Sequence, residues 1–244
     1  MEFDNKDYGF LVSCSVGDGH INRKTHTTKK GLEMEYYALQ IVHAVRQSDY
    51  LHYKADRINK ILGMDKPVKN FMNGRGFPGN PRGYPAVKYQ ISSFALKPVF
   101  QLVYGEEGKK RYTQEVLDVM GLEGLSLLWM DDGSLTIRRK KTKAGTMTNG
   151  ARLGYLSTYT DTPEESELVG EWISSLTGVL PRLQPSKGKY RLMFNSHDLR
   201  AFCPIIDPFV IPAMKYKTDC KWINQRRSNT TPEMFIPAHM RNRR

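Results

Sequence analysis

The sequence GLSLLWMDDGSL, residues 124–135, joins an apolar run of helical length to an Asp-Gly pair at its end. A second run of the same kind, FLVSCSVGDGHI, lies at residues 10–21. Each run is followed by a basic stretch and then by a strand-like apolar segment; these lie at residues 22–30 and 36–43, and at residues 138–143 and 151–159. Two blocks in the same order indicate an internal repeat, so the chain is predicted to consist of two similar halves.

Helix signals continue the repeat. A helix is predicted in the first half over residues 49–62, opened by Ser48. Its counterpart is predicted over residues 163–176, where Thr162 is the N-cap residue and Glu165 lies at the third helical position. This spacing is that of a capping box, in which each side chain satisfies a backbone amide at the helix start.

The remaining segments complete the same order in each half. Two further strands and a closing helix are predicted at residues 68–75, 84–91 and 94–104, and again at residues 180–185, 190–195 and 197–206. The order is therefore α-β-β-α-β-β-α, twice, which predicts an α+β fold with two pseudo-symmetric halves. The glycines of the stretch at residues 73–83 do not open a helix after a strand, so we interpret it as a loop and not as a dinucleotide-binding turn.

The overall charge indicates a polyanionic partner. The formal net charge is +12 and the isoelectric point is near 9.5, and basic residues are in excess in both halves, which is typical of nucleic-acid binding. A merely soluble basic protein is the alternative on charge alone. No run of about 18 apolar residues occurs, so we expect no membrane span. Three cysteines without metal-ligand spacing suit a reducing compartment.

The two Asp-Gly pairs suit phosphodiester chemistry. Mg²⁺ takes oxygen ligands and keeps several waters, so one carboxylate for each ion, completed by phosphates, is sufficient. An acid at the end of a helix can offer its carboxylate together with terminal backbone carbonyls, which makes Asp18 and Asp132, with the adjoining Gly17 and Asp131, candidate metal contacts. A lone Asp-Gly pair is more often a hairpin turn. The duplication, and the apolar helix before each pair, favours the metal site.

Close packing of the two helices would bring the acids together. In the first helix Ser13 and Gly17, four residues apart, are small enough for close approach. The second helix has Leu127 and Asp131 at the equivalent positions, which predicts a looser fit. We expect Cys14 to pack in the helix, and His20, His43, His52 and His197 to be packing or surface residues without metal or nucleophile geometry.

At this point the sequence resembles the LAGLIDADG homing endonucleases. The nine-residue motif of that family falls on residues 11–19 and 125–133. The blocks LWMDDGS, residues 128–134, and PFVIPAMKYK, residues 208–217, are similar to segments of its single-chain, intron-encoded members. The resemblance covers residues 8–220, and the second half is the stronger match.

The resemblance implies a set of catalytic residues. The acid before the last glycine of each motif holds the metals in the family, which assigns that role to Asp18 and Asp132, with Mg²⁺ as cofactor and Mn²⁺ as a possible substitute. Asp131 would then be structural. A lysine near each scissile phosphate falls on Lys217 in the second half and on either Lys109 or Lys110 in the first, where the register is open by one residue.

The same resemblance implies the fold and the partner. Each half would form a four-stranded antiparallel saddle on double-stranded DNA, with halves at residues 1–113 and 114–225 and a basic tail at residues 226–244. The expected protein is a monomer without an obligatory protein partner. Side chains that alternate outward along the strands would read bases, although a phosphate contact or a solvated strand face is the commoner role of any single one. The candidates are Asn22, Lys24, His26, Lys69, Asn73, Arg75, Lys88, Gln90, Arg138, Lys140, Arg182, Gln184, Lys189 and Arg191.

Three functions are compatible with this family. The first is a metal-dependent endodeoxyribonuclease that cuts a long asymmetric DNA site across the minor groove. The others are an RNA maturase that assists intron splicing and a DNA-binding regulator that does not cleave; both tolerate loss of the motif acids. Because both acids and Lys217 are present, we expect cleavage. An enzyme embedded in an intein is disfavoured, since the chain begins with Met and does not end in His-Asn.

Overall fold

The computed structural model describes residues 3–27, 31–73, 84–105, 108–141 and 147–219. The predicted order of elements is confirmed in both halves. The first half comprises α1 (Asn5–Val16), β1 (Gly19–Thr27), β2 (Glu33–Ala44), α2 (Ser48–Leu62), β3 (Lys69–Asn73), β4 (Tyr84–Ser93) and α3 (Lys97–Tyr104). The second comprises α4 (Gln114–Asp132), β5 (Gly133–Lys141), β6 (Met147–Thr160), α5 (Pro163–Thr177), β7 (Arg182–Ser186), β8 (Lys189–Phe194) and α6 (Ser196–Ile206), followed by a 3-10 segment, η4 (Pro212–Lys217).

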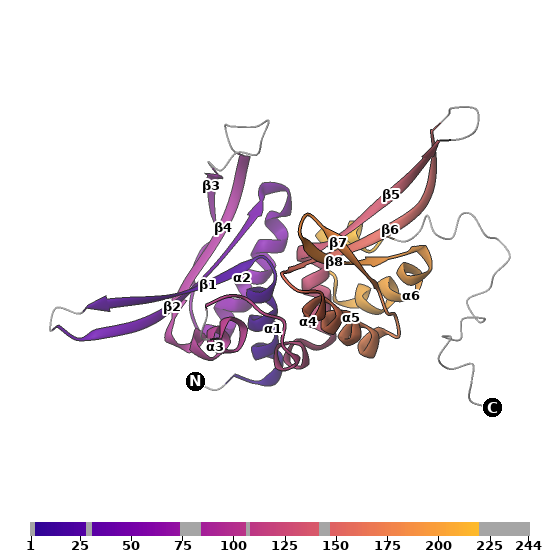
Figure 1. The fold of residues 1–244 in the computed structure, drawn as a ribbon. Coiled ribbons are helices and arrows are strands. Elements are labelled where there is room, and N and C mark those ends of the chain that lie inside the picture. Colours follow the sequence, from indigo (N-terminus) through magenta and orange to yellow (C-terminus); the bar gives the residue numbers. More distant parts are fainter. Residues whose placement is uncertain (1–2, 28–30, 74–83, 106–107, 142–146, 220–244) are drawn as a thin grey trace.

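Each half contributes one four-stranded antiparallel sheet. The strand orders are β1-β2-β4-β3 and β5-β6-β8-β7, so the topology repeats as well as the order along the chain. Figure 1 shows the two sheets on opposite sides of the molecule, with α1 and α4 between them. The pairing register repeats too, because Gly19 lies opposite Ile41 and Gly133 lies opposite Leu156. Corresponding positions of the two halves can therefore be compared directly.

The core lies between the sheets and the helices. Alternate residues of the strands face inward, as period-2 patterning requires. Ile21, Leu39 and Tyr89 do so in the first sheet, and Leu156 and Leu192 do so in the second; all are at most 1% exposed. Together with the buried faces of the helices they form one hydrophobic cluster that joins both halves.

The two motif helices pack closely along their length. A Cβ atom at Gly9 would overlap the backbone oxygen of Val119, and one at Gly124 would overlap the hydroxyl of Ser13. The predicted close approach on the α1 side is therefore confirmed. The expected looser fit of α4 was wrong, because Gly124 supplies a small residue one turn away from the positions that were compared.

The helix caps predicted from the sequence are confirmed in part. The Thr162 side chain accepts a hydrogen bond from the Glu165 amide, and Gly178 ends α5 with a φ of 70°, a conformation that favours glycine. The reciprocal half of the predicted capping box is not formed, because the Glu165 carboxylate accepts from the amide of Tyr112 at 2.6 Å and so connects the segment before α4 to α5. Ser48 lies inside α2 and does not cap it; a 3-10 turn at residues 45–47 precedes that helix. None of the helices in the described ranges has the length and apolarity that crossing a membrane requires.

Candidate active site

Two lysines bind the carbonyl oxygens at the C-terminal ends of α1 and α4 in equivalent ways. Lys110 donates from Nζ to the carbonyl oxygens of Val16, at 3.2 Å, and Gly17, at 2.7 Å. Lys217 donates to the carbonyl oxygen of Met130 and, at 2.9 Å, to that of Asp131. Burial lowers the pKa of both lysines, and the nearby acids oppose that effect. Each motif helix therefore ends at a lysine side chain, and both positive charges act on both motif acids.

The structure distinguishes Lys110 from Lys109, which the sequence left open. Both lysines lie in the exposed linker before α4, but Lys110 mirrors Lys217 because its Nζ donates to the carbonyl oxygens at the end of α1. Cationic groups at a helix C-terminus also interact favourably with the partial negative charge of that end. Lys110, and not Lys109, is therefore the first-half counterpart of Lys217.

The two motif acids lie within electrostatic reach of each other. Burial, followed by the charges of Asp131 and Asp18, raises the pKa of Asp132 to about 7. Burial, followed by the charge of Asp131, raises the pKa of Asp18 to about 6. Carboxylates held together against mutual repulsion are a feature of functional sites, since a bound cation relieves the repulsion. The pair at the helix ends therefore has the electrostatic character of a cation site.

A buried ion pair lies beneath this site, and the sequence did not predict it. Lys54 on α2 places its Nζ 2.6 Å from Oδ1 of Asp131, and both side chains are fully buried. Oδ2 of Asp131 accepts from the backbone amide of Asp18 at 3.1 Å. Burial alone would raise the pKa of Asp131, but the charge of Lys54 outweighs it and holds that pKa below its usual value.

His43 also faces the acids, which corrects the expectation that it is a packing residue only. Its side chain is buried, and its Nδ1 lies 3.4 Å from Oδ2 of Asp18. Asp18, His43 and Asp131 each place one possible ligand atom within 4.8 Å of the others. Burial, followed by the charge of Lys54, lowers the pKa of His43 to about 4. The imidazole is therefore neutral near pH 7, and its unprotonated nitrogen can accept a hydrogen bond or bind a cation.

The donor set fits a hard divalent cation at the carboxylates. Asp18 and Asp132 are oxygen donors with raised pKa values, which is the chemistry that Mg²⁺ prefers. The terminal carbonyls are less suitable than expected, because those of Gly17 and Asp131 already accept from lysines. Asp131 is also engaged through its carboxylate, by Lys54 and by the Asp18 amide. Of the four candidates, Asp18 and Asp132 are thus the two whose carboxylates form no ion pair with a lysine among the described residues.

The first sheet presents most of its predicted DNA contacts on one face. Asn22, Lys24 and His26 are exposed, and the two-residue period of the strand puts them on the face of β1 opposite to that of the buried Ile21. Strand pairing places Gln90 opposite Gln40 and Lys88 opposite both Val42 and Lys69, which puts these residues on the same face, away from the helices. Asn73 lies in β3, and Arg75 lies outside the described residues.

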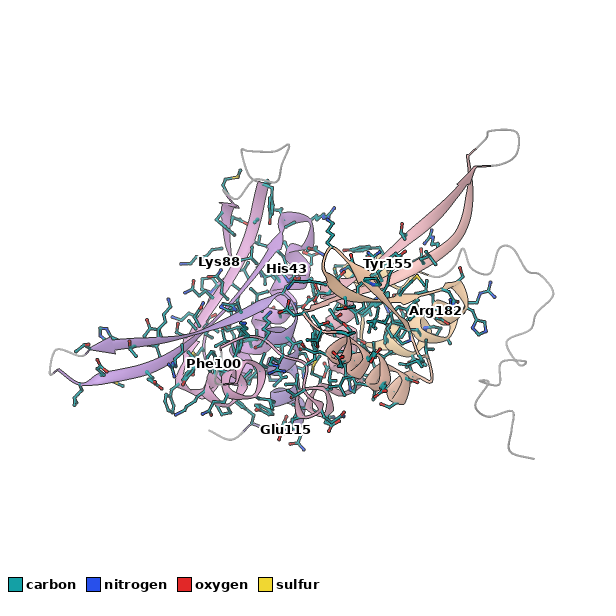
Figure 2. The ribbon with its side chains drawn as sticks, viewed as in Figure 1. His43, Lys88, Phe100, Glu115, Tyr155 and Arg182 are labelled. Carbon is teal, nitrogen blue, oxygen red and sulfur yellow. The ribbon has the colours of Figure 1, made fainter. Side chains whose placement is uncertain are left out.

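The second sheet has a preformed polar cluster on its equivalent face. The Arg191 guanidinium lies 4.0 Å from the centre of the Tyr155 ring, and its Nε donates to Gln184 at 3.0 Å. Figure 2 shows Tyr155 and Arg182 on this half and Lys88 on the other, with His43 nearer the middle of the molecule. Lys189 forms an ion pair with Asp161 at 3.2 Å. Arg138 and Lys140 lie in β5, and a register irregularity falls at residue 138.

With two acid-ended helices between two basic sheets, the chain has the architecture of a two-motif nuclease fold. The family model for the LAGLIDADG DNA endonuclease family matches residues 10–202. The chain belongs to the LAGLIDADG DNA endonuclease family.

Solved structures share this fold at low sequence identity. The homing endonuclease I-WcaI bound to its DNA recognition sequence superposes with a TM-score of 0.64 at 19% identity, over 89% of this chain and 88% of that one. I-SmaMI bound to an uncleaved DNA target in the presence of calcium ions gives a TM-score of 0.60 at 12% identity, over 93% and 94% of the two chains.

Curated sequence relatives are larger proteins. The protein RecA of Mycobacterium shimoidei is 22% identical over 96% of this chain, but the match covers 51% of its own length. The uncharacterized protein MJ1098 of Methanocaldococcus jannaschii is 32% identical over 47% of this chain and 41% of its own length. The chain thus spans about half the length of the curated relatives it matches, or less.

Proposed function

We propose that the protein is a site-specific double-strand DNA endonuclease that uses a divalent metal, Mg²⁺ or Mn²⁺. The observation that carries the proposal is the duplicated arrangement in which an acid and a lysine meet at the end of each motif helix. Lys110 contacts the helix end that precedes Asp18, and Lys217 contacts the end of the helix that carries Asp132. The charge of each lysine acts more strongly on the motif acid of the other half, so the two half-sites form one shared centre. A double-strand break needs two phosphodiester hydrolyses, and one half-site for each strand satisfies that need.

The acids and the lysines have separate roles. Asp18 and Asp132 would hold the metal, which supplies charge neutralisation on the phosphate and an activated water when it is bound. Lys110 and Lys217 place fixed positive charges beside the acids, where they stabilise the negative charge that develops on the phosphate oxygens.

The two sheets would bind the DNA on either side of the cut. Their outer faces carry the predicted polar and basic contacts, and the two sets differ in sequence. A single chain with unlike halves is free of the symmetry that a homodimer imposes on its site. We therefore infer a monomer that recognises a long asymmetric site, on the order of two turns of DNA, and cuts at its centre across the minor groove.

A selection experiment tests this function. Purified protein is incubated with circular DNA that carries a randomised insert, with Mg²⁺ present, and the linearised molecules are sequenced. The expected result is one long asymmetric consensus with cuts near its centre, absent when Asp18→Asn or Asp132→Asn protein is used. Binding without cleavage by the wild type, or preferential binding of structured RNA, would favour the regulator or the maturase instead.

A further inference from the structure

The buried pair of Lys54 and Asp131 joins the two halves directly beneath one of the acids. Lys54 belongs to α2 in the first half, and Asp131 belongs to α4 in the second. Asp131 then accepts from the backbone amide of Asp18 in the first half. The contacts thus run from Lys54 through Asp131 to the backbone of Asp18, and every atom involved lies at the junction of the motif helices.

The second half has no charged equivalent at the matching positions. α2 and α5 are both 15 residues long and follow corresponding strands, so Lys54 aligns with Val169, a core residue that is 0% exposed. In the repeated motif, Asp131 aligns with Gly17. A Cβ atom at Gly17 would overlap the carboxylate of Asp131, so the absence of a side chain in one half makes room for the acid of the other.

A histidine lies beside Asp18, whereas a neutral residue occupies the corresponding position in the second half. The strand register makes Thr158 the counterpart of His43. His43 faces Asp18 at 3.4 Å, whereas the hydroxyl of Thr158 pairs with that of Ser166 at 2.9 Å. Lys54, Asp131 and His43 thus lie on the Asp18 side of the centre, whereas the positions that correspond to them in the repeat hold the neutral residues Val169, Gly17 and Thr158.

We propose that Lys54 is a positioning residue that acts, through Asp131, on Asp18 and not on Asp132. Without Lys54, the Asp131 carboxylate would be a buried charge without its partner, and it would turn away from its present position. This displacement removes the acceptor that holds the Asp18 amide. The charge of Asp131 reaches both acids, but the hydrogen bond reaches Asp18 alone. Loss of Lys54 should therefore change the cleavage rates of the two DNA strands by different factors.

The test measures each strand separately and rests on the proposed function. A site recovered by the selection above carries a different label on each strand, and cleavage is followed in a single turnover with saturating protein. Lys54→Met should change the ratio of the two strand rates by about tenfold or more, since a displacement of about 1 Å can cost about 100-fold in rate. The double variant K54V/D131G, which copies the neutral pair Val169 and Gly17, should shift the ratio in the same direction. It keeps the test valid if Lys54→Met does not fold.

Two control variants separate positioning from stability. Lys60→Met removes an exposed lysine from the same helix, and Leu51→Ala weakens the core of that helix at a fully buried position. Both should leave the ratio of strand rates as in the wild type, even if Leu51→Ala lowers the overall rate. An unchanged ratio in Lys54→Met and in K54V/D131G, with the wild type cutting both strands, would overturn this inference alone. Failure of the wild type to cut any selected DNA would overturn the proposed function together with it.

Discussion

The Nζ atom of Lys110 lies 2.7 Å from the carbonyl oxygen of Gly17, at the end of the first motif helix. Lys217 makes the matching contact with Asp131 at the end of the second. The repeat therefore extends beyond the motif acids to their basic partners, although these partners reach the site from different elements. Lys110 lies in the linker before α4, and Lys217 lies in η4 after α6.

Loss of either lysine should impair cleavage and spare DNA binding. Lys110→Met and Lys217→Met each remove a fixed charge beside an acid, and such preorganised groups contribute about 100- to 1,000-fold to rate in other enzymes. We expect a fall of that order in single-turnover rate at unchanged affinity. Lys109→Met, at the exposed neighbouring position, is the matched control and should cleave at the wild-type rate. If Lys109→Met were the defective variant, the assignment of Lys110 would be wrong.

The raised pKa of Asp132, about 7, predicts that the free energy of unfolding of the metal-free protein falls as the pH rises. A carboxyl whose pKa is higher in the folded state stabilises the protein at low pH, and that contribution is lost as the pH rises from about 4 to about 7. In urea unfolding with chelator, Asp132→Asn should therefore gain stability relative to the wild type as the pH rises through this range. Its advantage over the wild type at pH 8 should exceed that at pH 5 by roughly 1–3 kcal/mol. Equal destabilisation at both pH values would contradict this prediction.

Close packing of the motif helices makes Gly9 sensitive to substitution. A Cβ atom there would overlap the backbone oxygen of Val119, and backbone cannot move aside as a flexible side chain can. Gly9→Ala should lower the free energy of unfolding by about 1–3 kcal/mol. Gly170→Ala in α5 is the control, because its Cβ would meet Leu192 at an ordinary 3.6 Å. It should be neutral or stabilising, since alanine favours helix over glycine.

Arg191 should read one base on the flank that the second sheet contacts. Its ring contact with Tyr155 and its hydrogen bond to Gln184 fix the guanidinium, and its terminal nitrogens suit the two acceptors of guanine. Sites selected by the wild type should carry a guanine at one position of that flank. Arg191→Ala should relax that position alone, with a loss of about 1–3 kcal/mol of discrimination. Lys189→Ala should instead weaken binding to all sites and lessen its salt dependence.

Most of the fold could be predicted because the signals repeat. The two Asp-Gly motifs, the cap at Thr162 and the terminating glycine at Gly178 are local patterns that tertiary structure did not override. The two-residue period of a strand also placed Asn22, Lys24 and His26 on one face of β1, opposite to the buried Ile21. Repetition let each half support the interpretation of the other.

The groups beneath the acids could not be found in the same way. Lys54 and His43 reach the site only through packing between elements that are distant in sequence. One signal was present, because Lys54 lies four residues from both Tyr50 and Ile58 on the apolar face of α2. A charged residue on a buried helical face calls for a partner, but helical periodicity does not reveal which one.

The central claim is that Asp18 and Asp132 together hold the metal at the cut. The most direct test is a crystal structure of the protein on its selected DNA with Mn²⁺, in which anomalous scattering locates the ions. The proposed function predicts peaks between the ends of α1 and α4, in contact with the carboxylates of Asp18 and Asp132 and with the central phosphates. Peaks bound elsewhere, with these two carboxylates unengaged on cleavable DNA, would contradict it.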